Sequence, residues 1–319
     1  MGKPFLVVMC GLQCSGKSTK AKELATSDLE YPNAVVLSSD KLREEYKSAK
    51  NDTIFRILYE RMNDLLGKGI TVIIDATNIT IKSRKQIFQN LKADCYKYCY
   101  IMNTPYEVCL ERLKERNQTD YPHKFDADII KRYYYSFEVP FLEEGWDDIF
   151  IEYHTDIEDC RKYTSGILET ADHFNQMNKH HCQSLGTHMQ TVGFRIQDEI
   201  ESNNDTRSLI SAAFYHDVGK LFTQTFRDGD PNAHYYNHAN VGAYELLCKS
   251  GCYNVFKNFE GLEIYEYNAV RTLEWLFYIN YHMHLFNVQT EKAEKKWRGI
   301  FGDKKFDHLK LLNKVDKAR

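Results

Sequence analysis

The chain has 319 residues, of which 43% are hydrophobic, and its formal net charge is -3. This length predicts about two domains of common size. The charge excludes an overall basic field that would attract nucleic acid, although a local basic groove remains open. No run of about 18 apolar residues is present, which argues against a membrane span. The start of the chain lacks the long apolar core of a signal peptide.

The cysteines bear on the cellular compartment. The chain has 9 of them, and no two are spaced as C-x-x-C, so the spacing of a zinc ribbon is missing. Free thiols are typical of a reducing environment. We therefore expect a cytoplasmic protein that makes no use of a membrane.

The first half of the chain alternates short apolar strands with helical stretches. The predicted strands are Phe5–Cys10, Ala34–Leu37, Ile70–Ile74, Tyr96–Ile101 and Ile149–Tyr153. A helix start is predicted at Pro105, with Thr104 as its cap and Glu107 completing a capping box. This alternation is typical of a parallel sheet covered by helices, so we predict an α/β domain over residues 1–155.

The strand signal fades after Tyr153. Residues 154–168 are polar and mark the expected domain boundary, and Arg227–Tyr236 is predicted to be a loop. The helices predicted for the remainder are Thr187–Glu201, Ser208–Tyr215, Asn240–Lys249, Ala269–Tyr281 and Phe306–Lys317. We therefore predict an all-α second domain over residues 168–319.

A glycine-rich loop follows the first predicted strand. Gly11–Ser18 has the pattern G-x-x-x-x-G-K-S, and the helical stretch Thr19–Ala25 comes next. Such a loop points backbone N–H groups at one spot, where the helix N-terminus favours phosphate. Lys17 can reach the outer phosphates of ATP or another nucleoside triphosphate, and the Ser18 hydroxyl can bind Mg²⁺. The expected nucleotide contacts are Gly11, Cys14, Ser15, Gly16, Lys17, Ser18 and Thr19.

This loop also has simpler interpretations. It can be a glycine turn with an incidental lysine, although the strand before it and the helix after it favour a nucleotide site. Cys14 is either a small residue that fits the loop or a thiol that responds to oxidation.

Charged side chains follow the next strands, on the side where parallel sheets bind ligands. Asp40 either accepts a proton from an acceptor hydroxyl or caps a helix. Arg43 either holds an anionic part of that acceptor or is solvated. Asp75 ends the third strand and can assist the metal. Arg112 and Arg116 share a helix face, and they form either a lid over the triphosphate or a charged surface.

Histidines and aspartates suited to metal binding lie in the second half. A single histidine is more often a surface or core residue, but the order of these histidines and aspartates favours a metal site. The expected ligands are His188, His216, Asp217 and Asp316 for one ion, with His238 and His282 for a second. This mixed nitrogen and oxygen set suits Mn²⁺, Fe²⁺, Co²⁺ or Ni²⁺, and Zn²⁺ is also possible. Such ions would lower the pKa of a bound water and neutralise phosphate oxygens.

Other residues near this set have expected roles. Lys220 follows His216 by one helical turn, and it either contacts a phosphate or stabilises a helix end. His181 lies two turns before His188 and is expected to face the substrate. His234 and His284 are not expected to be ligands.

The first half resembles the phage-type polynucleotide 5′-kinase group of P-loop kinases. The resemblance covers about residues 1–153 and rests on the phosphate loop, Ser38–Arg43, Asp75–Asn78 and the Arg112/Arg116 pair. It implies that Asp40 is the general base, that Arg43 grips a substrate phosphate and that Arg116 touches the ATP phosphates. Lids of this group often carry a further arginine, whereas here the next basic residue is Lys124.

The second half resembles the HD phosphohydrolase superfamily, whose pattern is H…HD…D. The resemblance begins near residue 180 and includes Ala212–Lys220 and Tyr236–Ala243. A 5′-kinase joined to an HD domain resembles bacterial and phage RNA end-healing enzymes. The resemblance implies ATP-dependent phosphorylation of 5′-OH ends of RNA or DNA. It also implies removal of 2′,3′-cyclic, 2′- or 3′-phosphates, with Asp217 and Lys220 as catalytic residues. A functional link to a nucleic-acid ligase is implied as well.

Two other interpretations stay open. The kinase can act on a nucleoside or small metabolite and the HD domain on a mononucleotide or phosphodiester, which the modest net charge permits. Alternatively, the protein is a nucleotide sensor with a structural metal site, although Lys17, Asp40 and His216–Asp217 argue against this. The aromatic run Tyr133–Tyr135 can stack on bases or pack in a core.

Overall fold

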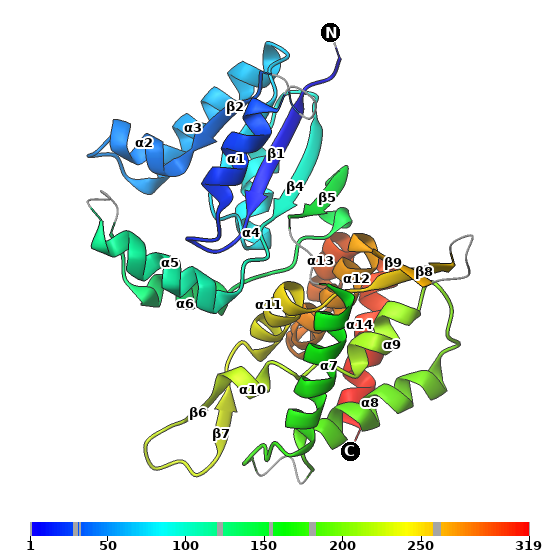
Figure 1. Ribbon diagram of the computed structural model, residues 1–319. Coiled ribbons are helices and arrows are strands. Elements are labelled where there is room, and N and C mark those ends of the chain that lie inside the picture. Colours follow the sequence, from blue (N-terminus) through cyan, green and yellow to red (C-terminus); the bar gives the residue numbers. More distant parts are fainter. Residues whose placement is uncertain are drawn as a thin grey trace. The chain divides into compact units, whose positions relative to one another are not determined.

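The computed structural model describes residues 2–27, 31, 33–119, 124–152, 156–178, 183–257 and 263–318. The chain divides into two compact units. We call Met1–Tyr133 with Glu144–Tyr153 the sheet unit, and Tyr134–Glu143 with His154–Arg319 the helical unit. Figure 1 labels the elements of each. Within the described residues, no helix has the length and apolar character needed to cross a bilayer.

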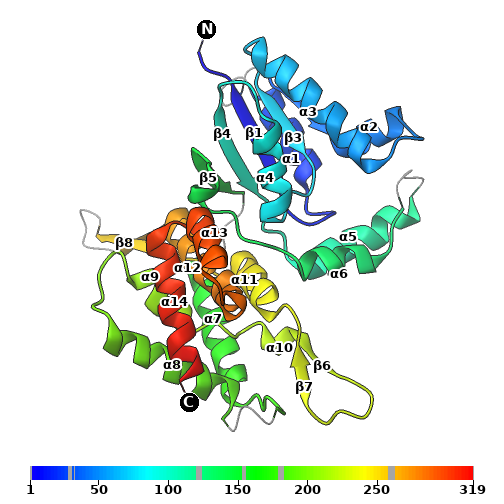
Figure 2. The same cartoon turned by 180° about the vertical axis from the view of Figure 1, so that it is seen from behind.

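The sheet unit contains a five-stranded parallel sheet, as predicted. Its strands are β1 (Phe5–Cys10), β2 (Val35–Ser38), β3 (Val72–Asp75), β4 (Tyr96–Ile101) and β5 (Asp148–Ile151), in the order β2-β3-β1-β4-β5. Helix α1 (Lys17–Thr26) covers one face, and α3 (Asn51–Gly67) and α4 (Ile81–Asn90) cover the other (Figures 1 and 2). Right-handed crossovers produce this division. Because both faces are covered, Leu6–Cys10 in the central strand is fully buried.

Three further helices stand near the carboxyl ends of these strands. They are α2 (Ser39–Glu45), α5 (Tyr106–Gln118) and α6 (Ala127–Tyr134) (Figure 1). The predicted capping box at the start of α5 is wrong, because Pro105 is the N-cap and makes no side-chain cap. The Thr104 hydroxyl instead donates to the Ser15 carbonyl at 2.7 Å. Local sequence assigns the Thr104 hydroxyl to the helix cap, but the hydroxyl instead bonds a residue of the phosphate loop that is distant in sequence.

The helical unit is mostly helical, as predicted. Its helices are α7 (Ile157–Asp172), α8 (Leu185–Glu199), α9 (Arg207–Ala213), α10 (Lys220–Thr223), α11 (His238–Lys249), α12 (Ala269–Tyr281), the 3-10 helix η2 (His282–Asn287), α13 (Glu291–Phe301) and α14 (Asp303–Lys317). It is not purely α. Two antiparallel hairpins are present, β6 (Gln224–Phe226) with β7 (Ala233–Tyr235), and β8 (Tyr253–Lys257) with β9 (Glu263–Tyr267). The predicted loop Arg227–Tyr236 is therefore partly strand.

The polar stretch expected between the domains is largely helix α7. The Asp156 side chain caps this helix by accepting from the Glu158 N–H at 2.8 Å. Its inner face buries Cys160, Ile167 and Ala171. Only one face of such an amphipathic helix is apolar, so its composition alone resembles that of a linker.

A short segment of the first predicted domain, Tyr134–Glu143, belongs to the helical unit. Phe137 and Val139 are fully buried there. The Val139 N–H donates to Asn280 Oδ1 at 2.8 Å, and the Tyr281 hydroxyl donates to the Val139 carbonyl at 2.8 Å. The Phe141 ring lies edge-on to Phe277 at 5.0 Å between centroids. This segment thus completes the helical core with residues that precede β5.

We expect Phe141→Ala to destabilise the helical unit by about 3–5 kcal/mol, because it leaves a cavity in an aromatic cluster. Leu142→Ala is the matched control, since Leu142 is the next residue and its side chain is exposed. Urea denaturation of the full chain measures both free energies of unfolding. Equal, small losses for the two variants would show that the segment is not part of this core.

Candidate nucleotide pocket and metal centre

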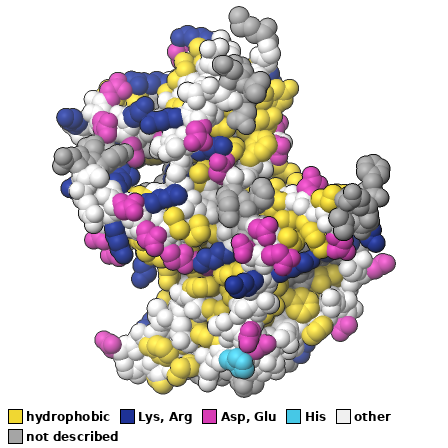
Figure 3. Space-filling model, in the orientation of Figure 1, with side chains coloured by type: hydrophobic (Ala, Val, Ile, Leu, Met, Phe, Trp, Pro, Cys, Tyr) yellow, Lys and Arg dark blue, Asp and Glu magenta, His cyan; other side chains and the backbone are white. Residues whose placement is uncertain are grey.

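A pocket of about 960 Å³ lies in the sheet unit at the carboxyl ends of the strands. Lys and Arg side chains, dark blue, border the hollowed part of this unit in Figure 3. Of the residues predicted here, those lining the pocket are Cys14, Ser15, Gly16, Lys17, Ser18, Thr19, Asp40, Arg43, Asp75, Arg112 and Arg116. Gly11 is not a lining residue. Its N–H donates to the Thr77 carbonyl at 3.0 Å, and a Cβ there would lie 2.9 Å from Ser15 Oγ. Gly11 therefore allows the close packing of the loop but does not line the pocket.

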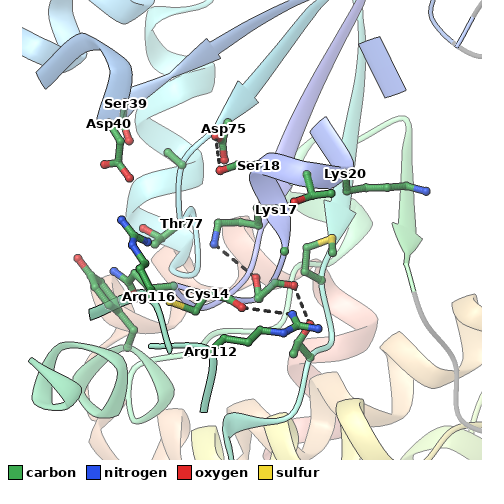
Figure 4. Close-up of a pocket in the computed structure, with 18 of the residues that line it drawn as sticks. Cys14, Lys17, Ser18, Lys20, Ser39, Asp40, Asp75, Thr77, Arg112 and Arg116 are labelled. Atoms are coloured by element: carbon green, nitrogen blue, oxygen red, sulfur yellow. Dashed lines mark hydrogen bonds between the residues drawn. The ribbon is translucent and has the colours of Figure 1, made fainter. Parts of the chain in front are cut away.

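The phosphate loop curls around the Lys17 side chain (Figure 4). Gly16 has φ 93°, in the region that favours glycine, and it is the N-cap of α1. The buried Lys17 ammonium donates to the Leu12 carbonyl and to Ser15 Oγ. Burial lowers the pKa of Lys17, while the charge of Asp75 opposes that change. An anion entering the loop would meet this ammonium and the start of α1 together.

Ser18 and Asp75 form the candidate magnesium site. The Ser18 hydroxyl donates to Asp75 Oδ2 at 2.7 Å (Figure 4). Asp75 is buried and is the last residue of β3. A hydroxyl and a carboxylate are the oxygen ligands that Mg²⁺ takes beside nucleotide phosphates. The pair therefore fits the ion, with Ser18 as a ligand and Asp75 beside it.

The segment after Asp75 is held by hydrogen bonds to β1 and α4. Asn78 Nδ2 donates to the Met9 carbonyl at 2.9 Å, and Arg84 Nη1 donates to the Asn78 carbonyl at 3.2 Å. Arg84 also makes a buried, two-pronged ion pair with Glu144, with both contacts at 2.7 Å. Paired in this way, the two charges tie the end of β3 to the segment that precedes β5.

Asp40 and Arg43 lie on α2, on another side of the pocket. Ser38 is the N-cap of α2, so the interpretation of Asp40 as that cap is wrong. Arg43 Nη1 donates to Asp40 Oδ1 at 2.6 Å and to Ser39 Oγ at 3.2 Å. The Asp40 and Arg43 side chains are 56% and 36% exposed. An ion pair this exposed stabilises little and opens at low cost when a substrate competes for it.

Arg112 and Arg116 approach the loop from α5. Arg112 Nη1 donates to the Cys14 carbonyl at 3.3 Å, and the Arg116 guanidinium lies 5.1 Å from the centre of the Phe125 ring. Figure 4 shows both beside the loop. Phe55 and Tyr133 also line the pocket, from α3 and α6. Phe55 was not among the predicted pocket residues and Tyr133 had two open interpretations, because neither lies in a recognisable motif.

All six predicted metal ligands meet inside the helical unit. They form two sets, each with donor atoms within 4.8 Å of one another: His188, His216 and Asp316, and then Asp217, His238 and His282. Five segments supply them: α8, the turn after α9, the start of α11, η2 and α14. His216 and Asp217 therefore lie in a turn and not on a helix.

Asp217 belongs to the second set and also approaches the first. Its Oδ2 lies 3.4 Å from His188 Nε2, and its Oδ1 lies 3.0 Å from His238 Nε2 and 3.6 Å from His282 Nε2. Asp316 Oδ1 closes the first set, at 3.0 Å from His188 Nε2. Donor atoms that share an ion at about 2.0–2.1 Å lie about 3 Å apart. The spacing fits two ions with Asp217 as a shared ligand.

Three of the histidines are oriented by the backbone. The Nδ1 atoms of His216, His238 and His282 lie 2.8, 2.9 and 2.7 Å from carbonyl oxygens three residues earlier. Because a carbonyl only accepts, each Nδ1 carries a proton, and in the neutral ring each Nε2 then presents a lone pair. Metal-binding histidines are held in this way. The ring orientations therefore fit the ions as well as the spacing does.

The charges in this centre support one another. Burial would raise the pKa of Asp217, but the Lys220 ammonium at 2.6 Å and the histidines hold it well below its usual range. Burial would lower the pKa of His188, yet Asp217 and Asp316 raise it to about 9. Lys220 is the first residue of the four-residue helix α10 and also lies in its last turn, so its interpretation as a charge that stabilises a helix end stays a prediction, as does its contact with a phosphate.

Two glycines let the Asp217 segment approach α11. A Cβ on Gly219 would lie 1.9 Å from the His238 carbonyl oxygen, and one on Gly242 would lie 2.8 Å from the Gly219 nitrogen. The two backbones therefore touch, and this contact brings Asp217 next to His238.

The remaining histidines of the prediction lie elsewhere. His234 pairs with Asp230 at 2.9 Å, and His284 packs edge-on against Trp297. Neither belongs to the two sets found in the described part of the chain. His181 lies outside the described residues.

The fold and pocket of the sheet unit define a P-loop kinase domain, followed by a mostly helical region that holds the histidine and aspartate sets. A family model described as an AAA domain matches residues 6–140. Over 162 residues, the chain is 25% identical to the proteins named KTI12 homolog of Oryza sativa subsp. indica and subsp. japonica. These matches cover 46% of this chain and 52% of each rice protein, so the chain spans about half the length of the curated relatives it matches.

Solved structures resemble parts of the chain. A chain of the Pnkp1/Rnl/Hen1 RNA repair complex is 23% identical, with a TM-score of 0.37, over 42% of this chain and 43% of that one. A putative kinase from Chloroflexus aurantiacus is 20% identical, with a TM-score of 0.39, over 53% of this chain and 98% of that one.

We expect the wild-type protein to bind two manganese ions per chain and the His282→Ala variant to bind one, because that change removes a ligand from one set only. His234→Ala is the matched control, since His234 lies outside both sets, and it should retain two. Elemental analysis after equilibrium dialysis gives these counts. A full count of two in the His282→Ala protein would contradict the assignment.

Proposed function

We propose that the chain heals nucleic-acid ends: it phosphorylates 5′-OH ends with ATP and removes 2′,3′-cyclic, 2′- or 3′-phosphates with bound divalent metal ions. The observation that supports this most is the presence of two chemically distinct sites on one chain, a nucleotide pocket lined by Lys17 and a buried metal-type centre around Asp217. Ends treated in both ways are substrates for a nucleic-acid ligase, which is the proposed functional partner.

In the kinase step, Lys17 and the lid arginines hold the triphosphate. The 5′-hydroxyl oxygen attacks the γ-phosphorus, its proton passes to Asp40, and ADP leaves. Arg43 has two uses in this proposal. Its contact with Asp40 at 2.6 Å orients that carboxylate, and its guanidinium is placed to hold an acceptor phosphate beside it.

In the phosphate-removing step, the six ligands of the helical unit would hold two ions, which would lower the pKa of a bound water and neutralise oxygens of the substrate phosphate. Lys220 contributes a fixed positive charge, because its ammonium lies 2.6 Å from the carboxylate that the two sets share. Positioned cations of this kind stabilise the charge that develops on phosphate oxygens.

We expect Lys17→Ala to lower phosphate transfer from ATP to a 5′-OH oligonucleotide by about 100-fold or more, because it removes a cation from the phosphate site. The same variant should keep phosphate release from 2′,3′-cyclic ends. Asp217→Asn should show the reverse pattern. End-labelled RNA incubated with Mn²⁺, with and without ATP, reports both activities in one assay.

The two variants serve as controls for each other. If both activities fell together in either well-folded variant, the two sites would not be separate. Nucleosides and small hydroxyl metabolites complete the substrate panel, and their phosphorylation in preference to oligonucleotides would contradict the assignment to nucleic-acid ends.

A further inference from the structure

Gln176 is a fully buried polar residue in the segment between α7 and α8. Its Oε1 accepts from the Lys220 ammonium at 2.9 Å, and its Nε2 donates to the Gln183 carbonyl at 3.4 Å. The reverse orientation of the amide would place N–H groups against the ammonium and oxygen against oxygen. Both ends of the side chain are therefore fixed, and the oxygen faces Lys220.

The hairpin β6–β7 holds Gln176 in this place. The Tyr235 hydroxyl donates to the Gln176 carbonyl at 2.5 Å and accepts from Gln224 Nε2 at 2.9 Å. The Lys220 ammonium also lies 5.6 Å from the centre of the Tyr235 ring. The same strand supplies the Tyr235 carbonyl that orients His238. One short strand thus supports both a metal ligand and the surroundings of Lys220.

This arrangement holds the ammonium between one charged acceptor and one neutral acceptor. An ammonium has three N–H donors, and within the described chain Asp217 takes one and Gln176 another. The Gln176 amide oxygen adds no negative charge, whereas a carboxylate at its place would pair the cation a second time. Lys is a flexible side chain, so a second contact is what holds its end in a single place.

We propose that Gln176 is a positioning residue of the phosphate-removing site: it holds the Lys220 ammonium beside the shared carboxylate so that this cation binds an oxygen of the substrate phosphate. The inference rests on the proposed function of the helical unit. It adds to that function a residue outside the ligand set and assigns it a role in binding phosphate and not in binding metal.

The test uses the full chain loaded with Mn²⁺ and inorganic phosphate as the probe. We expect Gln176→Met and Gln176→Glu each to weaken phosphate binding by about tenfold or more, because one loses the acceptor and the other traps the cation. Both variants should retain two ions per chain. Isothermal titration with phosphate and elemental analysis give the two readouts, and KM for a phosphate-ended oligonucleotide should rise more than kcat falls.

The same change made elsewhere controls for it. Gln190→Met removes an exposed amide that contacts Asp172, and it should leave phosphate binding unchanged. Lys220→Met should lose as much affinity as Gln176→Met, and the double variant should lose no more than Lys220→Met alone. Phosphate affinity within twofold of wild type in Gln176→Met, or loss of its metal ions, would overturn the proposal.

Failure of the proposed function has a different signature. In that case the wild-type protein would bind phosphate but release none from any 2′,3′-cyclic, 2′- or 3′-phosphate end. Absence of phosphate binding by the wild-type protein would overturn the role of Gln176 itself.

Discussion

Burial of the Asp217 carboxylate is the constraint on which the helical unit depends. A buried charge is tolerated only when it is paired and hydrogen-bonded. Here a lysine and histidines of both sets supply that pairing, and they come from segments spread along the chain from α8 to η2. Asp316 on α14 is connected to this centre through its contact with His188. The helices must therefore converge at one point, and the close contact between Gly219 and Gly242 shows how tightly they do so.

The two candidate sites are built in opposite ways, and each suits its proposed task. The nucleotide pocket is open, and its Asp40–Arg43 pair is exposed and easily rearranged. A nucleotide and an acceptor must enter and leave such a site in every cycle. The candidate metal centre is buried, and backbone carbonyls orient its histidine rings. Ions that stay bound gain affinity when their ligands are held in advance.

Much of this could be predicted from the sequence. The strand–loop–helix pattern around Lys17 has a fixed local geometry, so it places a phosphate site without knowledge of the rest of the fold. The order of His188, His216–Asp217 and Asp316 predicted a shared site because mixed nitrogen and oxygen donors suit divalent metals and because the order resembles the H…HD…D pattern. Asp75 could be placed because strands of a parallel sheet end at one edge.

The rest depends on contacts between residues distant in sequence. Thr104 has the local features of a helix cap, yet it donates to Ser15 in the phosphate loop. Gln176 has no motif, and only the folded hairpin brings it to Lys220. The segment Tyr134–Glu143 reads as part of the first domain because it precedes β5, but its apolar side chains complete the helical core. Patterns within one segment carry no information about such partners.

The most direct test of the two-site account is a crystal structure of the wild-type protein grown with Mn²⁺ and a non-hydrolysable ATP analogue, with anomalous diffraction recorded for manganese. The account predicts two manganese peaks flanking the Asp217 carboxylate and, in the same molecule, the analogue's phosphates on the loop that ends at Ser18. Density for the analogue without manganese beside Asp217, or manganese there with no nucleotide at the loop, would contradict it.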